Sequence, residues 1–172
     1  MSVSAGGESR FDHWGSELNG RMPGGSDLTQ KPWCSTSVGS GLNAAVQQFL
    51  LAAYTLNQRY TTVEANGCGC QTGNWGIFSQ AAVAEINASE EFAQSVGAIT
   101  FSGQAKTDAA ALVQALLGRD AVMRQGLAKG SFSGFHAVDP QRLPYENAIG
   151  VALLSLRADL ALRAGTCTYM MP

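Results

Sequence analysis

The residues of this sequence with the clearest chemical potential are its four cysteines. Cys68 and Cys70 lie one residue apart in the glycine-rich stretch NGCGCQTGNWG at positions 66–76, whereas Cys34 and Cys167 lie toward the two ends of the chain. An even set of cysteines indicates disulfides in an oxidising compartment, and free thiols or a metal site in a reducing one. The spacing of the four residues bears on that choice.

A metal site is one interpretation of this spacing. Structural zinc needs four ligands in tetrahedral geometry, and cysteine pairs separated by two residues are usual, whereas Cys68 and Cys70 are separated by one. A four-cysteine site would therefore also need Cys34 and Cys167 to fold back onto this loop. A disulfide between Cys68 and Cys70 would be strained, but one from the loop to either end would tie that end to the core. Idle thiols in a glycine turn are the third interpretation, and we expect no cofactor.

A thiol enzyme is the catalytic hypothesis. Cys34 precedes a predicted helix, and the dipole at a helix N-terminus favours a thiolate nucleophile. His136 would then act as the base and Asp139 as its orienting partner. The HAVD stretch that holds both resembles the histidine strand of papain-like cysteine peptidases over these four residues. In that family more strands follow the histidine, whereas here a helix is expected, so the sequence departs from the family's pattern at this point.

Other motifs that would indicate catalysis or phosphate binding do not occur. The sequence contains no E-x-x-H pair for a di-iron bundle, no G-x-G-x-x-G or G-x-x-x-x-G-K-[ST] phosphate loop, and no G-x-S-x-G nucleophile elbow. A buried acid is predicted at Glu85, on the apolar face of its helix, where it needs a cationic partner. Arg157 and Arg59 are the candidates for that partner.

The composition restricts the classes of function. Charged residues make up 14% of the chain, against about 25% in a typical soluble domain. The net charge is -2 and Lys and Arg form no cluster, so nucleic-acid binding is not expected. No apolar run approaches the roughly 20 residues of a membrane span, and the N-terminus lacks the pattern of a signal peptide. We expect a cytoplasmic or particle-associated protein.

Hydrophobic periodicity predicts a mainly α fold with four amphipathic helices in a bundle. The predicted helices are 40–60 with Ser40 as its cap, 75–96 with an interruption at 87–89, 108–127 with a possible break at its glycines, and 144–164. Residues 61–74 and 129–143 are expected as loops, and AITFSG at 98–103 as a short strand or a connector.

The ends of the chain differ from this helical domain at residues 39–172. Residues 1–38 are rich in Gly and Ser but carry spaced aromatic residues, which predicts an extended arm that lies on a surface. A short tail follows the last helix. Low charge, this arm and an uncharged helix face from Leu42 to Gln58 favour a structural subunit that forms homo-oligomers or docks in a larger particle, such as a virion or tail component. The alternative is a thiol-dependent enzyme or metal protein that uses Cys34 and His136, or Cys68 and Cys70.

Overall fold

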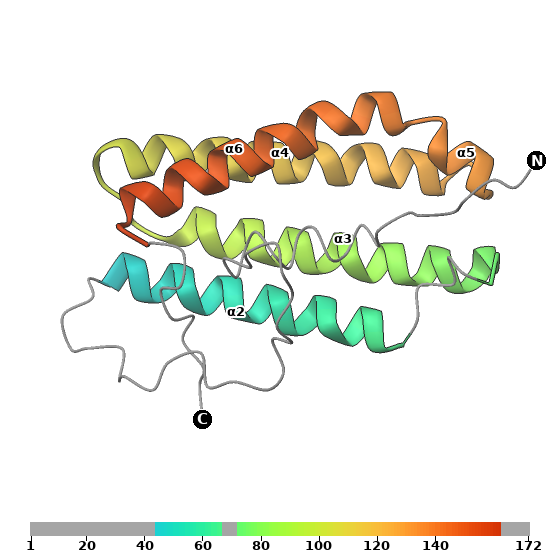
Figure 1. Ribbon diagram of the computed structural model, residues 1–172, viewed down its shortest axis with the longest axis horizontal. Coiled ribbons are helices and arrows are strands. Elements are labelled where there is room, and N and C mark those ends of the chain that lie inside the picture. Colours follow the sequence, from blue (N-terminus) through green and yellow to red (C-terminus); the bar gives the residue numbers. More distant parts are fainter. Residues whose placement is uncertain (1–43, 67–71, 163–172) are drawn as a thin grey trace, which may run out of the picture.

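The computed structural model describes residues 44–66 and 72–162 of the 172-residue chain. The described residues contain no strand and form five helices: α2 (Ala44–Ala65), α3 (Trp75–Ala98), α4 (Gly103–Leu127), α5 (Phe132–His136) and α6 (Asp139–Asp159). The four long helices run antiparallel to their neighbours in the sequence, and α5 lies at one end of α4 (Figure 1). The predicted mainly α bundle is therefore confirmed.

Several predictions fall on other parts of the chain. The N-terminal arm at residues 1–38, the Ser40 cap, the cysteine pair and the C-terminal tail all lie outside the described residues. Within the described ranges, no helix is both long enough and apolar enough to cross a membrane.

One hydrophobic core joins the four long helices. α4 packs on both α3 and α6, and α2 packs on α3. Phe49 of α2, Leu112 of α4 and Leu156 of α6 are fully buried in this core, and α3 adds Phe92, whose ring lies 6.3 Å from that of Phe49. Burying side chains of this size contributes about 1.5–3 kcal/mol each, which is why the apolar stripes determine the packing.

The first described helix is longer than predicted. The sequence suggested an end near Tyr60 and a loop from residue 61, but α2 continues to Ala65. Tyr60 and Val63 are both buried, so the extra turn adds apolar contacts. The hydroxyl groups of Thr61 and Thr62 donate to carbonyl oxygens one turn earlier, which satisfies these exposed side chains within the helix.

The predicted interruption at residues 87–89 is wrong, because α3 passes through them without a break. Ala88 and Ser89 are buried, and Asn87 faces outward, where its Oδ1 accepts a hydrogen bond of 3.4 Å from Arg124 Nη2. Packing against neighbouring helices has overridden the weak helix propensity of Asn and Ser. The helix begins as a capped helix should, since the Asn74 side chain accepts from the Ile77 backbone N–H.

Two glycines were expected to weaken α4, yet the helix is continuous from Gly103, five residues before the predicted start at Asp108. A Cβ on Gly118 would lie 2.3 Å from the ring of Tyr145, and one on Gly126 would lie 2.8 Å from Val138. At both glycines, therefore, α6 or its preceding turn approaches α4 too closely for a Cβ to fit without a shift. The AITFSG segment is a connector and not a strand. Ala98 ends α3, Gly103 begins α4, and residues 99–102 join the two helices.

The last described helix begins earlier than predicted, and the expected loop at 129–143 contains α5 and the first turn of α6. Pro144 therefore lies inside α6 and does not begin it. Asp139 and Pro140 occupy the first turn, where an acid and a proline are both favoured. Arg142 then binds Asp139 one turn before it and Glu146 one turn after it, which stabilises the helix around the proline.

We predict that Gly126→Ala lowers the free energy of unfolding by about 1–3 kcal/mol, because the added methyl group overpacks a buried contact. Gly97→Ala is the matched control, since a Cβ at Gly97 would meet nothing within 4 Å. The control should gain up to about 1 kcal/mol from better helix propensity. Urea denaturation followed by circular dichroism measures both variants, and equal changes of the same sign would contradict the packing at Gly126.

Candidate functional site

The structure brings together two of the three candidate catalytic residues. His136 ends α5 and Asp139 begins α6, and the imidazole Nδ1 lies 3.0 Å from the carboxylate Oδ2. Arg142 donates to the other oxygen of Asp139 at 3.0 and 3.3 Å, which fixes the carboxylate in place. A carboxylate on Nδ1 leaves Nε2 available to accept a proton, which is the arrangement of an oriented general base. His136 is exposed at the surface.

The cysteine predictions fall outside the described residues. Cys34, the candidate nucleophile, and the candidate metal ligands Cys34, Cys68, Cys70 and Cys167 all belong to ranges that the structure does not describe. Among the residues that it does describe, no group of three or more His, Cys, Asp and Glu side chains could hold a metal ion. The thiol and metal hypotheses therefore stay predictions.

A buried ionic cluster lies in the bundle, and sequence reasoning anticipated only one member of it. Arg119 of α4, 1% exposed, donates from Nε and Nη2 to Asp120 Oδ1 at 2.9 and 2.7 Å. Its Nη1 lies 3.4 Å from Oε1 of Glu85 on α3. Tyr60 of α2 and Ser89 of α3 complete the cluster. Glu85 does have the cationic partner that was predicted, but it is Arg119 and neither Arg157 nor Arg59.

Burial and charge act against each other in this cluster. Burial raises the pKa of Glu85 and of Asp120, and the nearby Arg119 only partly opposes this. Burial likewise raises the pKa of Tyr60 to about 12, so its phenol is neutral. Burial alone lowers the pKa of Arg119, but Tyr60 and the two acids reverse that and raise it overall. Arg119 therefore stays charged, whereas the two carboxyl groups resist ionisation.

Two polar atoms in this cluster are not hydrogen-bonded. Ser89 Oγ and Asp120 Oδ2 are fully buried and have no partner within normal hydrogen-bond geometry. The Ser89 hydroxyl is still close enough to favour the ionised form of Asp120. An unsatisfied buried polar atom costs about 1–3 kcal/mol, so the position is energetically demanding.

The sequence carries a signal for Arg119 that can be recognised with hindsight. Arg119 follows Leu116 by three residues and precedes Met123 by four, which is the spacing of the buried stripe of α4. A charged residue at a stripe position predicts a buried ion pair. Asp120, the next residue, carries the same signal, because it follows Leu116 by four residues and precedes Met123 by three.

An aromatic cluster forms a second, smaller core beside the start of α3. Trp75, Phe78, Phe132 and Phe135 place their ring centres 4.9–6.5 Å apart in edge and tilted contacts. The rings contact one another, and Ile86, Met123 and Leu127 pack in the same cluster, which attaches α5 to both α3 and α4. This packing explains their spacing as core residues.

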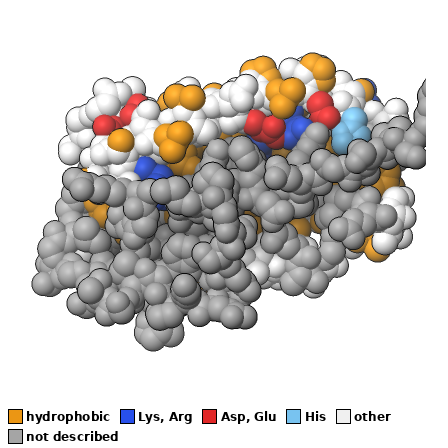
Figure 2. Space-filling view, viewed as in Figure 1, with side chains coloured by type: hydrophobic (Ala, Val, Ile, Leu, Met, Phe, Trp, Pro, Cys, Tyr) orange, Lys and Arg blue, Asp and Glu red, His pale blue; other side chains and the backbone are white. Residues whose placement is uncertain are grey.

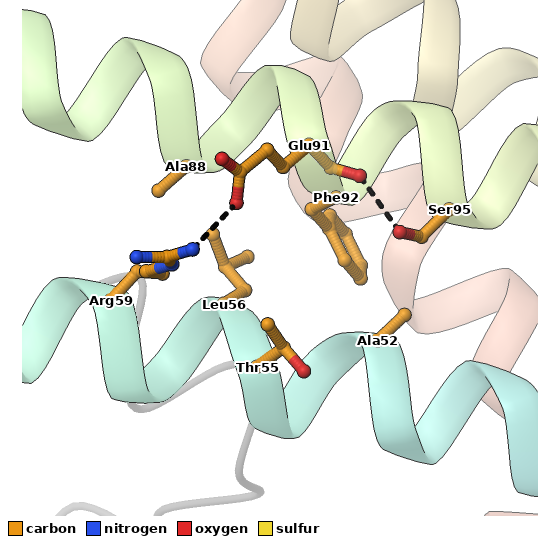
Figure 3. A pocket seen from close by; sticks show the side chains of 8 residues that line it. All are labelled: Ala52, Thr55, Leu56, Arg59, Ala88, Glu91, Phe92 and Ser95. Atoms are coloured by element: carbon orange, nitrogen blue, oxygen red, sulfur yellow. Dashed lines mark hydrogen bonds and ion pairs between the residues drawn. The ribbon is translucent and has the colours of Figure 1, made fainter.

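A small hollow lies between α2 and α3, with Leu56 and Phe92 on its apolar side and Arg59 and Glu91 at its rim (Figure 3). The rim pair is an exposed ion pair of 3.5 Å, which contributes little to stability. The hollow measures about 70 Å³. Pockets for small organic ligands usually measure about 300–1,000 Å³, so this one is too small for such a ligand.

The outer face of α6 carries large apolar side chains in water. Val151 is 67% exposed, Leu154 63% and Leu143 51%. Figure 2 shows hydrophobic side chains at several places along the upper edge of the molecule, where Figure 1 places α4 and α6. From Leu143 to Ala158, none of the fully exposed residues of α6 carries a charge. We call this surface the α6 face.

The comparisons with known proteins add no relative to this description. No protein-family model, curated protein or solved structure matches the chain.

We predict that Arg119→Met lowers the free energy of unfolding by about 3–5 kcal/mol at neutral pH, because it leaves the buried Asp120 and the partly buried Glu85 without their cation. Arg124→Met is the matched control, since Arg124 lies on the same helix and binds Glu90 at the surface. That exposed pair contributes about 0–1 kcal/mol. Urea denaturation measures both, and equal losses in the two variants would show that burial of Arg119 does not matter to stability.

Proposed function

We propose that the protein is a structural subunit that assembles with copies of itself, and that the α6 face is a contact surface in that assembly. The exposed apolar side chains of this face carry the proposal. Isolated surface leucines are common, but an aligned row on one helix without exposed charge marks an interaction surface.

The spacing along the α6 face suits pairing with another helix. Asn147, Val151, Leu154 and Ala158 follow one another at intervals of four, three and four residues. This is the alternation of a coiled-coil seam, in which side chains of one helix fit between those of the next. The stretch from Leu143 to Ala158 is about 24 Å long, given a rise of about 1.5 Å per residue. Leu154 lies near the centre of the apolar part of this seam.

A second copy of the chain is the partner that this face fits best. In a two-fold contact the same patch meets itself, so a charged patch would repel its copy and a neutral patch would not. The α6 face is neutral over its whole length. A partner of opposite charge has nothing on this face to recognise.

α2 offers a further neutral surface. Its exposed residues from Ala44 to Gln58 are alanine, glutamine, threonine and a leucine, Leu51, with no charge among them. α2 and α6 lie at opposite edges of the bundle in Figure 1. Two separate neutral surfaces would let one chain contact more than one neighbour, as larger rings, filaments and shells require. This supports a component of a larger particle, of which a virion or a tail is an example.

We predict that Leu154→Asp weakens self-association at least tenfold, which corresponds to about 1.4 kcal/mol, because it would place a charge against its own copy across the contact. Val83→Asp is the control, since Val83 is an exposed valine on α3, away from this face. Native mass spectrometry and sedimentation velocity on the full-length chain give subunit number and affinity. A wild-type monomer at high concentration, or equal effects of the two variants, would contradict the proposal.

A second candidate function is favoured by the contact between His136 and Asp139. If Cys34 lies near Nε2 of His136, the three residues would form a thiol, base and orienting acid of the kind that cysteine-dependent enzymes use. The low charge and the neutral α6 face find no explanation in this function. It is therefore the alternative and not the main proposal.

The rate at which iodoacetamide modifies Cys34, measured against pH in a chain whose other cysteines are serine, tests this alternative. If His136 activates the thiol, the midpoint should lie well below the ordinary value of about 8.5, and His136→Ala should move it upward. His13→Ala serves as the control histidine. A midpoint near the ordinary value that neither variant changes would rule out an activated Cys34.

A further inference from the structure

We propose that Glu85 and Asp120 retain one proton between them at neutral pH, so that the cluster around Arg119 is a proton-binding site that makes the folded chain more stable in mild acid. This inference concerns the interior of the bundle and is independent of the proposed assembly.

The cluster holds one cation and two acids. Arg119 is 1% exposed, Asp120 is 0% exposed, and the side chain of Glu85 is 14% exposed. With both acids ionised, the interior would carry an uncompensated negative charge, which costs several kcal/mol. One bound proton makes the three groups neutral as a set. Because the two acids share Arg119, the proton belongs to the pair and not to either residue alone.

Groups from α2 and α3 do not supply the missing positive charge. Tyr60, from α2, is a buried neutral phenol beside Arg119. Ser89, from α3, is uncharged, and Glu90, also on α3, adds negative potential at Asp120. Glu90 is itself paired with Arg124 at the surface, at 2.8 Å.

Groups from α6 do not supply the missing positive charge of the cluster either. Arg142 lowers and Glu146 raises the pKa of Glu85, so their effects on it oppose each other. Arg142 binds Glu146 and also Asp139. The charge of Arg142 is therefore already balanced by these two carboxylates, and it does not compensate the negative charge of Glu85 and Asp120.

The hydrogen-bond geometry at Asp120 leaves room for a proton. Arg119 directs both of its short hydrogen bonds to Oδ1, and Oδ2 is buried without a partner, as is the nearby Ser89 Oγ. A protonated carboxyl group gains one O–H donor while its other oxygen continues to accept. A proton on Asp120 Oδ2 would therefore turn an acceptor without a partner into a donor. The nearby Ser89 Oγ, which also lacks a partner, could accept from it.

The sign of the pH dependence follows from the direction of the shifts. Burial raises the pKa of both carboxyl groups above their values in the unfolded chain, which are about 3.9 for Asp and about 4.3 for Glu. At pH values between the unfolded-state pKa and the folded-state pKa, the folded chain therefore binds more protons than the unfolded chain. The extra stability is fully present below the unfolded pKa and is lost as the pH rises through the folded pKa.

Urea unfolding of the full chain across pH 5 to 8 tests the inference. The wild type should lose stability as pH rises, with an unfolding constant that increases by up to about tenfold per pH unit for one proton. Glu85→Gln should flatten this dependence, because only one acid then remains beside Arg119 and the cluster is neutral without a bound proton. Glu91→Gln is the matched control on the same helix, since Glu91 is exposed and pairs only loosely with Arg59. It should keep the wild-type slope.

Infrared spectroscopy gives a second result that does not depend on a variant that folds. A protonated carboxyl group has a C=O absorption separate from that of carboxylates and backbone amides. The folded wild type at pH 7 should show this band for one carboxyl per chain and lose it on thermal unfolding. Absence of the band at pH 7 would overturn the inference, whatever the pH dependence of stability. The inference would also be overturned if Glu85→Gln left the pH dependence of stability the same as in the wild type.

Discussion

The contact between Arg119 and the two acids Glu85 and Asp120 is the constraint around which the bundle is organised. It joins α3 to α4 in the interior, and Tyr60 brings α2 to the same point. Buried ion pairs add little net stability compared with apolar packing, but removing one partner is costly. The contact therefore acts mainly on the orientation of the helices and adds less to the stability of the fold. A rotation of α4 relative to α3 would separate Arg119 from Glu85 and leave a charge without its partner.

Hydrophobic periodicity was sufficient to predict the fold class and the approximate positions of the four long helices. It failed at their ends and at the expected breaks, and each failure has a tertiary cause. Residues 87–89 have weak helix propensity, but burial of Ala88 and Ser89 holds them in α3. Pro144 looked like a first-turn residue because its neighbours gave no sign that Arg142 would bind acids on both sides. The local sequence indicates the helix propensity of a segment, whereas packing between helices determines where each helix begins and ends.

The candidate sites were predictable in part. The pairing of His136 with Asp139 was predicted from the resemblance of the HAVD stretch to a histidine strand, and the two side chains do meet, but at the junction of α5 and α6 and not on a strand. That Glu85 is shielded from water and paired with a cation also followed from the pattern of its helix, although it is partly and not fully buried. Its partner did not follow, because the pattern of one helix does not state which helix packs against it. The α6 face was missed for a related reason. No role was predicted for Leu143, Val151 and Leu154, because the sequence pattern of one helix does not show which of its sides a neighbouring helix covers.

The distribution of charge connects the interior to the proposed function. Only 14% of the residues are charged, and several of these, Arg119, Asp120 and Arg142 among them, are buried. Charge used inside the bundle is not available to keep copies of the chain apart in water. The outer surface of the described residues is therefore less charged than the composition suggests, above all along α6, where Arg142 and Arg157 are buried and no fully exposed residue from Leu143 to Ala158 is charged. A chain that orders its interior with ions and leaves apolar side chains outside is suited to contact with its own copies.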